Sequence, residues 1–286
     1  MSKSRFRRWG TTLIAVPVMV LGALVFSATS AAASIGVVTV DADTQTDVGG
    51  DNTETVTAEC DGGSTLIGTG WIAGGAIVDE VVPDLSTGTV RVEAWEPEGG
   101  SVRANWSVTA RAICATSVSN VEVVQDGSSA YNSTNAPKSD TANCPFAKKL
   151  VGLGYEIGTF AEGEVHVTSV VPTDDEVTVT AYEDANGTTE SWSVTAYAVC
   201  ATEPSGLEVV TSTSPSTSSD LTVCPGVKKA IGAGGAVDIA RNDVDVWYAK
   251  TGTYGGYEYG IAGAAETSGA TTSNWTIAST VICVNP

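Results

Sequence analysis

The sequence has 286 residues, and its 33 acidic side chains outnumber its 14 basic ones, which gives a formal net charge of −19. A field of this sign repels nucleic acid and anionic lipid, so neither is expected as a partner. It is compatible with cations or neutral sugars as ligands. A chain of this length can bury one large core or several small ones.

Residues 1–33 are typical of a secretory signal peptide. A basic stretch at 3–8 precedes an apolar run at about 13–26, and three alanines at 31–33 form a small-residue cleavage site. The apolar run contains a proline and a glycine and is too short for a clean membrane span. We expect cleavage near Ser34 and a secreted, extracellular protein. The route, Sec or twin-arginine, stays open. Loss of four basic residues leaves 10 against 33 acidic ones, a net charge of −23.

The rest of the chain is a threefold repeat, with units at residues 34–118, 119–204 and 205–286. Each unit opens with a short valine strand, and these strands follow one another at intervals of 86 residues: Val37-Val38, Val123-Val124 and Val209-Val210. A Cys then has glycines eight and ten residues later: Cys60/Gly68/Gly70, Cys144/Gly152/Gly154 and Cys224/Gly232/Gly234. Finally, a Trp precedes a second Cys by eight residues: Trp106 and Cys114, Trp192 and Cys200, Trp275 and Cys283. Such self-similarity predicts a repeated supersecondary unit.

Between the two cysteines, the sequence predicts further strands. Units one and two alternate at residues 90–96 and 177–183, and a glycine-bearing connection then leads into the Trp strand, which indicates a hairpin. The third unit diverges in this region, with alternation at 244–246 and 257–261. No stretch has a sustained helical period. We therefore predict an all-β protein in which each unit of about 80 residues forms a small antiparallel sheet.

Six cysteines in an exported chain indicate three disulfides. They allow 15 connectivities, and the repeat favours pairing within each unit. The predicted bridges are Cys60–Cys114, Cys144–Cys200 and Cys224–Cys283. Each would close a loop of 54 to 59 residues, which stabilises the fold by about 4 kcal/mol on the chain-entropy model. This contribution matters because a unit of this size has a thin core.

Two assemblies fit the repeat. The units could pack about a pseudo-threefold axis, one sheet each, as in a β-prism, or they could form three consecutive small sandwiches. The links at residues 115–120 and 201–206 are short and contain one proline. Because links of this length hold neighbouring units close together, we favour the compact threefold body.

The motifs resemble those of known secreted repeats. The pattern Cys-Pro-x-x-Lys-Lys-x-x-Gly-x-Gly starts at Cys144 and Cys224, and Trp-x-Val-x-Ala-x-Ala-x-Cys-Ala follows at Trp192. Together they are similar to repeats in uncharacterised secreted proteins of Streptomyces-type actinobacteria, a resemblance that covers nearly the whole mature chain and implies no particular activity. The Cys-Pro and Gly signatures also resemble the vitelline membrane outer layer protein, a three-repeat β-prism. Its repeats are shorter, so this second resemblance implies architecture alone.

Aromatic residues fall into two groups. The Trp of each unit is expected to pack against that unit's disulfide, because a framework residue present in every unit usually serves the core. Aromatics peculiar to the third unit are the candidates for ligand binding: Trp247, Tyr248, Tyr254, Tyr257 and Tyr259. Tyr257 and Tyr259 share one face of an alternating strand, and nearby glycines keep the surface low, so their rings could stack on sugar rings. Alternatively, these rings form a cross-strand ladder that stabilises a diverged unit.

Other chemistry is less well supported. Acidic clusters at residues 41–51, 174–176 and 242–245 offer oxygen ligands that suit Ca²⁺, yet the first lacks the Gly and Glu of an EF-hand loop, and solvated carboxylates are favoured. The single histidine, His166, lies in an alternating strand and is expected to be exposed. No nucleophile elbow accompanies it, one histidine with paired cysteines gives no usual zinc site, and no carboxylate pair stands out for glycoside hydrolysis. We expect neither cofactor nor metal.

These observations predict a secreted, non-catalytic structural or binding protein at or outside the cell surface, whose partner is a polysaccharide or another extracellular protein. One alternative is a lectin-like carbohydrate-binding protein that uses the aromatics of the third unit. A second is an extracellular hydrolase whose acid pair is not identified.

Overall fold

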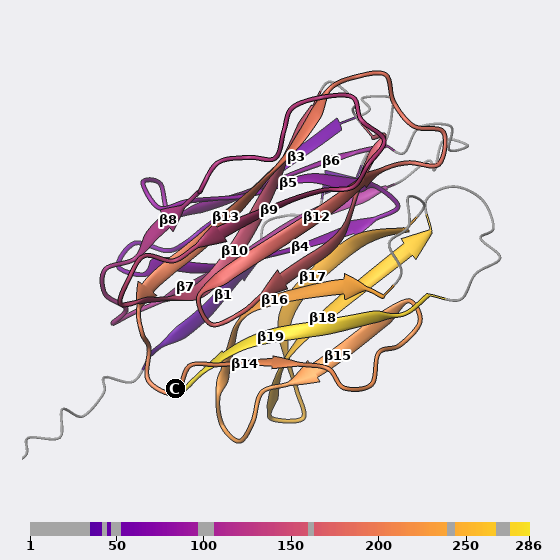
Figure 1. The fold of residues 1–286 in the computed structure, drawn as a ribbon. Helices are drawn as coiled ribbons and strands as arrows, with labels where there is room; N and C mark the ends of the chain where they lie inside the picture. The colour runs from indigo at the N-terminus through magenta and orange to yellow at the C-terminus, as the bar shows by residue number, and fades with distance from the viewer. Residues whose placement is uncertain are drawn as a thin grey trace, which may run out of the picture. The chain divides into compact units, whose positions relative to one another are not determined.

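The computed structural model describes residues 35–41, 45–46, 53–96, 106–159, 163–238, 244–266 and 275–286 (Figure 1). The regular elements of these segments are all strands, arranged as three antiparallel sheets. The predicted all-β class is therefore confirmed. The predicted signal peptide lies outside the described residues.

Neighbouring strands within each sheet often come from distant parts of the chain. Across sheet A the order is β1 (Val37–Asp41), β7 (Ser107–Ala115), β4 (Thr65–Gly74), β17 (Val244–Tyr254), β18 (Tyr257–Glu266) and β15 (Ser219–Val223), and β2 (Gln45–Thr46) also pairs with β7. Across sheet B it is β3 (Thr53–Glu59), β6 (Thr89–Trp95), β5 (Ile77–Asp84), β10 (Lys148–Thr159), β13 (Trp192–Thr202) and β8 (Glu122–Val124). Across sheet C it is β14 (Glu208–Thr211), β19 (Ile277–Val284), β16 (Lys229–Val237), β11 (Val165–Pro172), β12 (Glu176–Glu183) and β9 (Lys138–Asn143).

Every sheet is shared between two units of the repeat. The first unit supplies β1 to β7, the second β8 to β13 and the third β14 to β19, yet sheet A joins strands of units one and three, sheet B those of one and two, and sheet C those of two and three. This division differs from the expected arrangement of one sheet per unit. Alternation shows which side chains of a strand are buried but not which strand lies beside it, so the sharing was not visible in the sequence.

The first glycine of each Cys-Gly-Gly signature brings the strand backbones of different units into contact. A Cβ atom at Gly68 would overlap the carbonyl oxygen of Ile231 in the third unit, and one at Gly152 would overlap that of Ile67 in the first. The approach at Gly232 is looser, because a Cβ atom there would lie 3.5 Å from the carbonyl oxygen of Val151 in the second unit. The pairing register shifts at each of these glycines, as in a β-bulge. Gly68 and Gly152 are needed as glycine because no side chain fits between the backbones there.

The second glycine of each signature lies where two units join within a sheet. A Cβ atom at Gly154 would overlap the carbonyl oxygen of Val81, and one at Gly234 that of Val170. At Gly70 the approach is looser, because a Cβ atom there would lie 3.1 Å from the carbonyl oxygen of Ala249 in β17. These seams link β10 to β5, β11 to β16 and β17 to β4. The third seam pairs the last unit with the first, so the cycle of units is closed.

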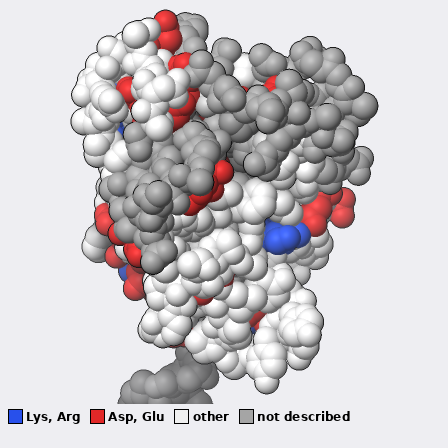
Figure 2. Space-filling view, turned by 90° about the vertical axis from the view of Figure 1, so that its right-hand side faces the viewer, with Lys and Arg blue, Asp and Glu red and all other residues white. Residues whose placement is uncertain are grey.

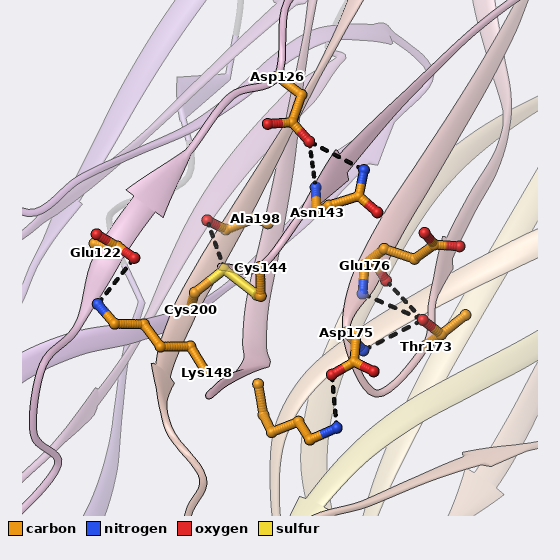
Figure 3. The surroundings of a disulfide bond; sticks show 11 residues. Glu122, Asp126, Asn143, Cys144, Lys148, Thr173, Asp175, Glu176, Ala198 and Cys200 are labelled. Carbon is orange, nitrogen blue, oxygen red and sulfur yellow. Dashed lines mark hydrogen bonds and ion pairs between the residues drawn. A yellow bond between two sulfur atoms is a disulfide. The ribbon is translucent and has the colours of Figure 1, made fainter. Parts of the chain in front are cut away.

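Each disulfide links two sheets within one unit. The bridges are Cys60–Cys114, Cys144–Cys200 and Cys224–Cys283, which confirms the predicted pairing. In the second unit Cys144 follows β9 of sheet C, while Cys200 lies in β13 of sheet B. Figure 3 shows this bridge beside the ion pair of Lys148 Nζ and Glu122 Oε1, 2.9 Å apart. Three such bridges are typical of proteins that mature in an oxidising compartment.

The repeated tryptophans belong to the core, as predicted. Trp106 and Trp192 are fully buried, and Trp275 packs partly buried against the same core. The indole of Trp192 donates a hydrogen bond to Glu183 Oε1 at 2.7 Å, and the Lys138 ammonium lies 3.8 Å from the ring centroid. A hydrogen-bonded indole N–H is the usual state of a buried Trp, and Trp192 shows it, whereas Trp106 Nε1 is buried with no hydrogen-bond partner among the described residues.

The expectation of an exposed histidine is wrong, because His166 is 1% exposed. It lies in the first half of β11, where four consecutive residues, Val165 to Thr168, are all buried. This part of the sheet is crowded, since β11 contacts both β5 and β17. Because consecutive residues of the segment are all buried, the alternation in the sequence does not separate a core side from a solvent side there.

Candidate functional site

The hairpin of β17 and β18 extends further than its counterparts in the other two units. In every unit the N–H of the first Cys donates to a carbonyl of this hairpin, at Gly88, Asp175 and Glu258 respectively. In units one and two this carbonyl lies in the connecting turn. In the third unit the strands continue past it, with Thr253 paired to Glu258 and Tyr254 paired to Tyr257. The third unit therefore carries two additional residue pairs at this end.

The added segment is a tight hairpin that exposes two tyrosines. Its turn is Gly255-Gly256, with φ values of 60° and 86°, which is the two-residue type I′ geometry that favours glycine. Tyr254 and Tyr257 flank the turn and are 81% and 61% exposed. The Glu258 carboxylate at the base accepts from Thr253 Oγ1 at 3.1 Å and pairs with Lys229 of β16 at 2.7 Å. These contacts hold the base of the hairpin to the body.

Strand pairing places the tyrosines on the outer face of sheet A. On this face the hairpin carries Tyr248, Tyr254, Tyr257, Tyr259 and Ile261, and the edge strand β15 adds Leu221 and Val223. We call these seven residues the tyrosine face. Leu221 and Val223 are 45% and 43% exposed, an unusual exposure for side chains of this kind on adjacent positions of one face. In Figure 2 the lower part of the surface, at the level of the hairpin in Figure 1, is almost free of charge.

Two of the tyrosine rings lie on glycines. A Cβ atom at Gly252 would overlap the ring of Tyr259, its cross-strand neighbour, and one at Gly263 would overlap the ring of Tyr248. Glycine opposite an aromatic residue lets the ring lie flat against the backbone. The outer faces of these rings are then directed away from the sheet, so they can contact a flat ligand.

In units one and two, the positions equivalent to Leu221, Val223, Tyr259 and Ile261 are polar. Positions one and three residues before the first Cys are Glu59 and Thr57, Asn143 and Thr141, and Val223 and Leu221. Their cross-strand partners are Thr89 and Arg91, Glu176 and Thr178, and Tyr259 and Ile261. In the second unit the hydroxyls of Thr141 and Thr178 lie 2.9 Å apart and satisfy each other. The fold thus accepts polar residues at these positions, and its stability does not require the apolar ones of the third unit.

Trp247 does not join the tyrosine face. It alternates with Tyr248, is partly buried against the core, and its Nε1 is buried with no hydrogen-bond partner among the described residues. Its ring centroid is 5.6 Å from that of Tyr248. Of the five predicted binding residues, the structure therefore brings four together. Sequence reasoning missed Leu221, Val223 and Ile261, although comparison of equivalent positions relative to each Cys could have identified the first two.

The predicted acidic clusters are largely engaged in ion pairs or lie outside the described residues. Asp41 pairs with Arg111, and Asp175 pairs with Lys149 at 2.6 Å. Residues 43, 47, 51 and 243 are not described. Within the described ranges, no group of three or more His, Cys, Asp or Glu is arranged to hold a metal ion. The described part of the chain also contains no helix long and apolar enough to cross a membrane.

Comparison of the sequence with models of known protein families and with curated proteins gives no match. Its function must therefore be argued from the tyrosine face itself.

Proposed function

We propose that this is a non-catalytic protein that acts outside the cell and binds a polysaccharide on its tyrosine face. One observation carries the proposal: of the three equivalent hairpins in the described chain, only that of unit three is lengthened, is tipped with exposed tyrosines and carries mostly aromatic and apolar side chains on its outer face. The predicted export segment, the disulfides and the resemblance to secreted repeat proteins support the extracellular location.

A sugar chain suits the form of this surface. Pyranose rings have an apolar face of C–H groups, which tyrosine rings can cover while their hydroxyls bond to the sugar's own. Successive residues on one face of a strand are about 6.6 Å apart, so Tyr257 and Tyr259 offer two stacking positions along β18. Contiguous exposed apolar surface on a soluble protein usually marks a binding site.

Binding without catalysis is favoured by the state of the neighbouring carboxylates. Glu258 is engaged by Lys229 and Thr253, and Asp41 is engaged by Arg111. Glycoside hydrolysis requires one carboxyl group as proton donor and a second as nucleophile or base. Each of these two carboxylates is already engaged by a cation of the protein, so neither is free to serve as that proton donor while its ion pair is kept.

The test is retention of the purified mature protein on insoluble chitin, cellulose and peptidoglycan, with tyrosine and tryptophan fluorescence as a second readout. We expect retention on at least one polymer. Tyr257→Ala should weaken it at least about fivefold, because the ring supplies one of the main contacts. Tyr131→Ala is the matched control, since Tyr131 is 53% exposed but lies in the second unit.

Failure of all three polymers to retain the wild-type protein would contradict the proposal, as would equal losses in the two variants. Release of soluble sugar during the incubation would indicate a hydrolase instead. Both variants should keep the unfolding temperature of the wild type, since each changes an exposed side chain.

A further inference from the structure

A row of charged residues crosses the outer face of sheet A beside the tyrosine face. Arg111 of β7 pairs with Asp41 of β1, with Nε–Oδ1 at 2.5 Å and Nη2–Oδ2 at 2.8 Å. Its side chain also passes over Gly70 of β4, and its Nη1 donates to the carbonyl oxygen of Thr251 in β17. Both oxygens of Asp41 are therefore occupied by one guanidinium.

Lys250 of β17 lies next to this pair and makes no hydrogen bond or ion pair with any described residue. The other described lysines all have one: Lys138, Lys148, Lys149, Lys228 and Lys229. Both described arginines, Arg91 and Arg111, are paired as well. In a chain with 33 acidic residues, a cation left unpaired among the described ones calls for an explanation.

The position of Lys250 is within the reach of a ligand on the tyrosines. Along the outer face of β17 it lies two residues from Tyr248 and two from Gly252, which the Tyr259 ring covers. Each step is about 6.6 Å, and the lysine side chain is long and flexible. Its cross-strand partner is Ile261, a member of the tyrosine face.

The surroundings of the ammonium disfavour its charge. Partial burial lowers the pKa of Lys250, the Arg111 guanidinium lowers it further, and Asp41 opposes them. The equivalent positions of units one and two are Val82 and Val171, one residue beyond the seam residues Val81 and Val170. The fold therefore has no need for a cation at this point, and a bound anion would relieve the repulsion between the two cations.

Resting on the proposed function, we infer that the ligand is a polysaccharide bearing carboxylate groups, and that Lys250 binds one such group while the sugar rings stack on Tyr248 and Tyr259. The negative charge of the whole protein limits how many carboxylate groups such a polysaccharide can carry along its chain. A net charge of −19 repels a heavily charged polymer, whereas Lys250 attracts a carboxylate within the screening length of about 8 Å. A chain with sparse acid groups satisfies both conditions.

The test compares each polymer that retains the protein with the same polymer oxidised to carboxylate at a small fraction of its primary hydroxyls. For the wild type we expect binding to the oxidised form to be about fivefold tighter, the size of a half-exposed ion pair, and this preference to decline with salt. Lys250→Val, which introduces the residue of the other two units, should reduce the ratio to one or below. Lys149→Gln, at a lysine of unit two, should keep the wild-type ratio.

The possible results separate the two proposals. Equal binding of both forms by the wild type, or a preference that survives Lys250→Val, overturns the carboxylate inference and leaves polysaccharide binding intact. If neither form of any polymer is retained, the proposed function fails and this inference fails with it. Circular dichroism and the unfolding temperature of Lys250→Val verify that the comparison concerns folded protein.

Discussion

The buried Asp245 allows a direct test of how burial in this core changes the pKa of a carboxyl group and, through it, the stability of the fold. It lies in β17, is 1% exposed, and its two carboxylate oxygens have no hydrogen-bond partner of normal geometry among the described residues. Burial raises the pKa of this carboxyl to about 8, an effect that the backbone N–H of Val167 partly offsets. Burial and then the nearby Asp245 and Asp79 carboxylates also raise the pKa of Tyr155.

The sign of the effect on stability follows from proton binding. The unfolded chain releases this proton near its ordinary pKa of 3.8, while the folded protein retains it up to about 8. Between these values the folded state binds more protons, so the free energy of unfolding falls as pH rises, and above about 8 the loss is complete. At 1.36 kcal/mol per pH unit, the loss between pH 5 and pH 8 is about 4 kcal/mol.

Asp245→Asn isolates this contribution, because the amide has nearly the same shape and does not ionise. Guanidinium unfolding of the wild type and the variant at pH 5 and pH 8 gives four free energies of unfolding. We expect the wild type to lose about 4 kcal/mol more than the variant over this interval. Asp61→Asn, in an exposed turn, should keep the wild-type pH dependence. Parallel pH dependence in wild type and Asp245→Asn would refute the reasoning.

Two further predictions concern the framework. Replacing Cys144 and Cys200 together by Ala opens a loop of 56 residues and should lower the free energy of unfolding by about 4 kcal/mol; a loss below about 1 kcal/mol in denaturant titrations would count against the chain-entropy account. Gly152→Ala should lower the unfolding temperature sharply, because its Cβ would meet backbone atoms of Ile67 and Gly68, which cannot move aside. Gly62→Ala, with open space around the new Cβ, should leave the unfolding temperature nearly unchanged, and equal effects of the two would be inconsistent with this packing.

The features that could be predicted from the sequence are those that repeat. Three Cys pairs with similar separations of 54, 56 and 59 residues indicated the disulfides, because the repeat favours pairing within units. The glycines eight and ten residues after the first Cys identified the repeat, but they did not show that Gly68 meets another unit and that Gly70 lies at a seam. Tyr257 and Tyr259 were assigned to one face because side chains alternate along a strand.

The remaining features depend on contacts between distant residues. Pairing of β15 with β18 places Leu221 beside Ile261. Alternation within one strand cannot reveal a contact between residues so far apart in the sequence. His166 was misplaced for a similar reason, since it lies where consecutive residues of β11 are all buried and where this strand contacts β5 and β17 of the other sheets. The unpaired state of Lys250 depends on Arg111 taking both oxygens of Asp41, which requires β1, β7, β4 and β17 to lie side by side.

The seam between β4 and β17 has a consequence for how the protein matures. No unit contains all the strands of a sheet. During synthesis the edge strand β4 of the first unit therefore stays unpaired until β17 of the third unit has been made. Contacts so far apart in sequence make closure slow, and open edges invite pairing with other chains. A third unit that meets the first unit of a neighbouring molecule would satisfy the same seam, so exchanged oligomers are the expected by-product of refolding at high concentration.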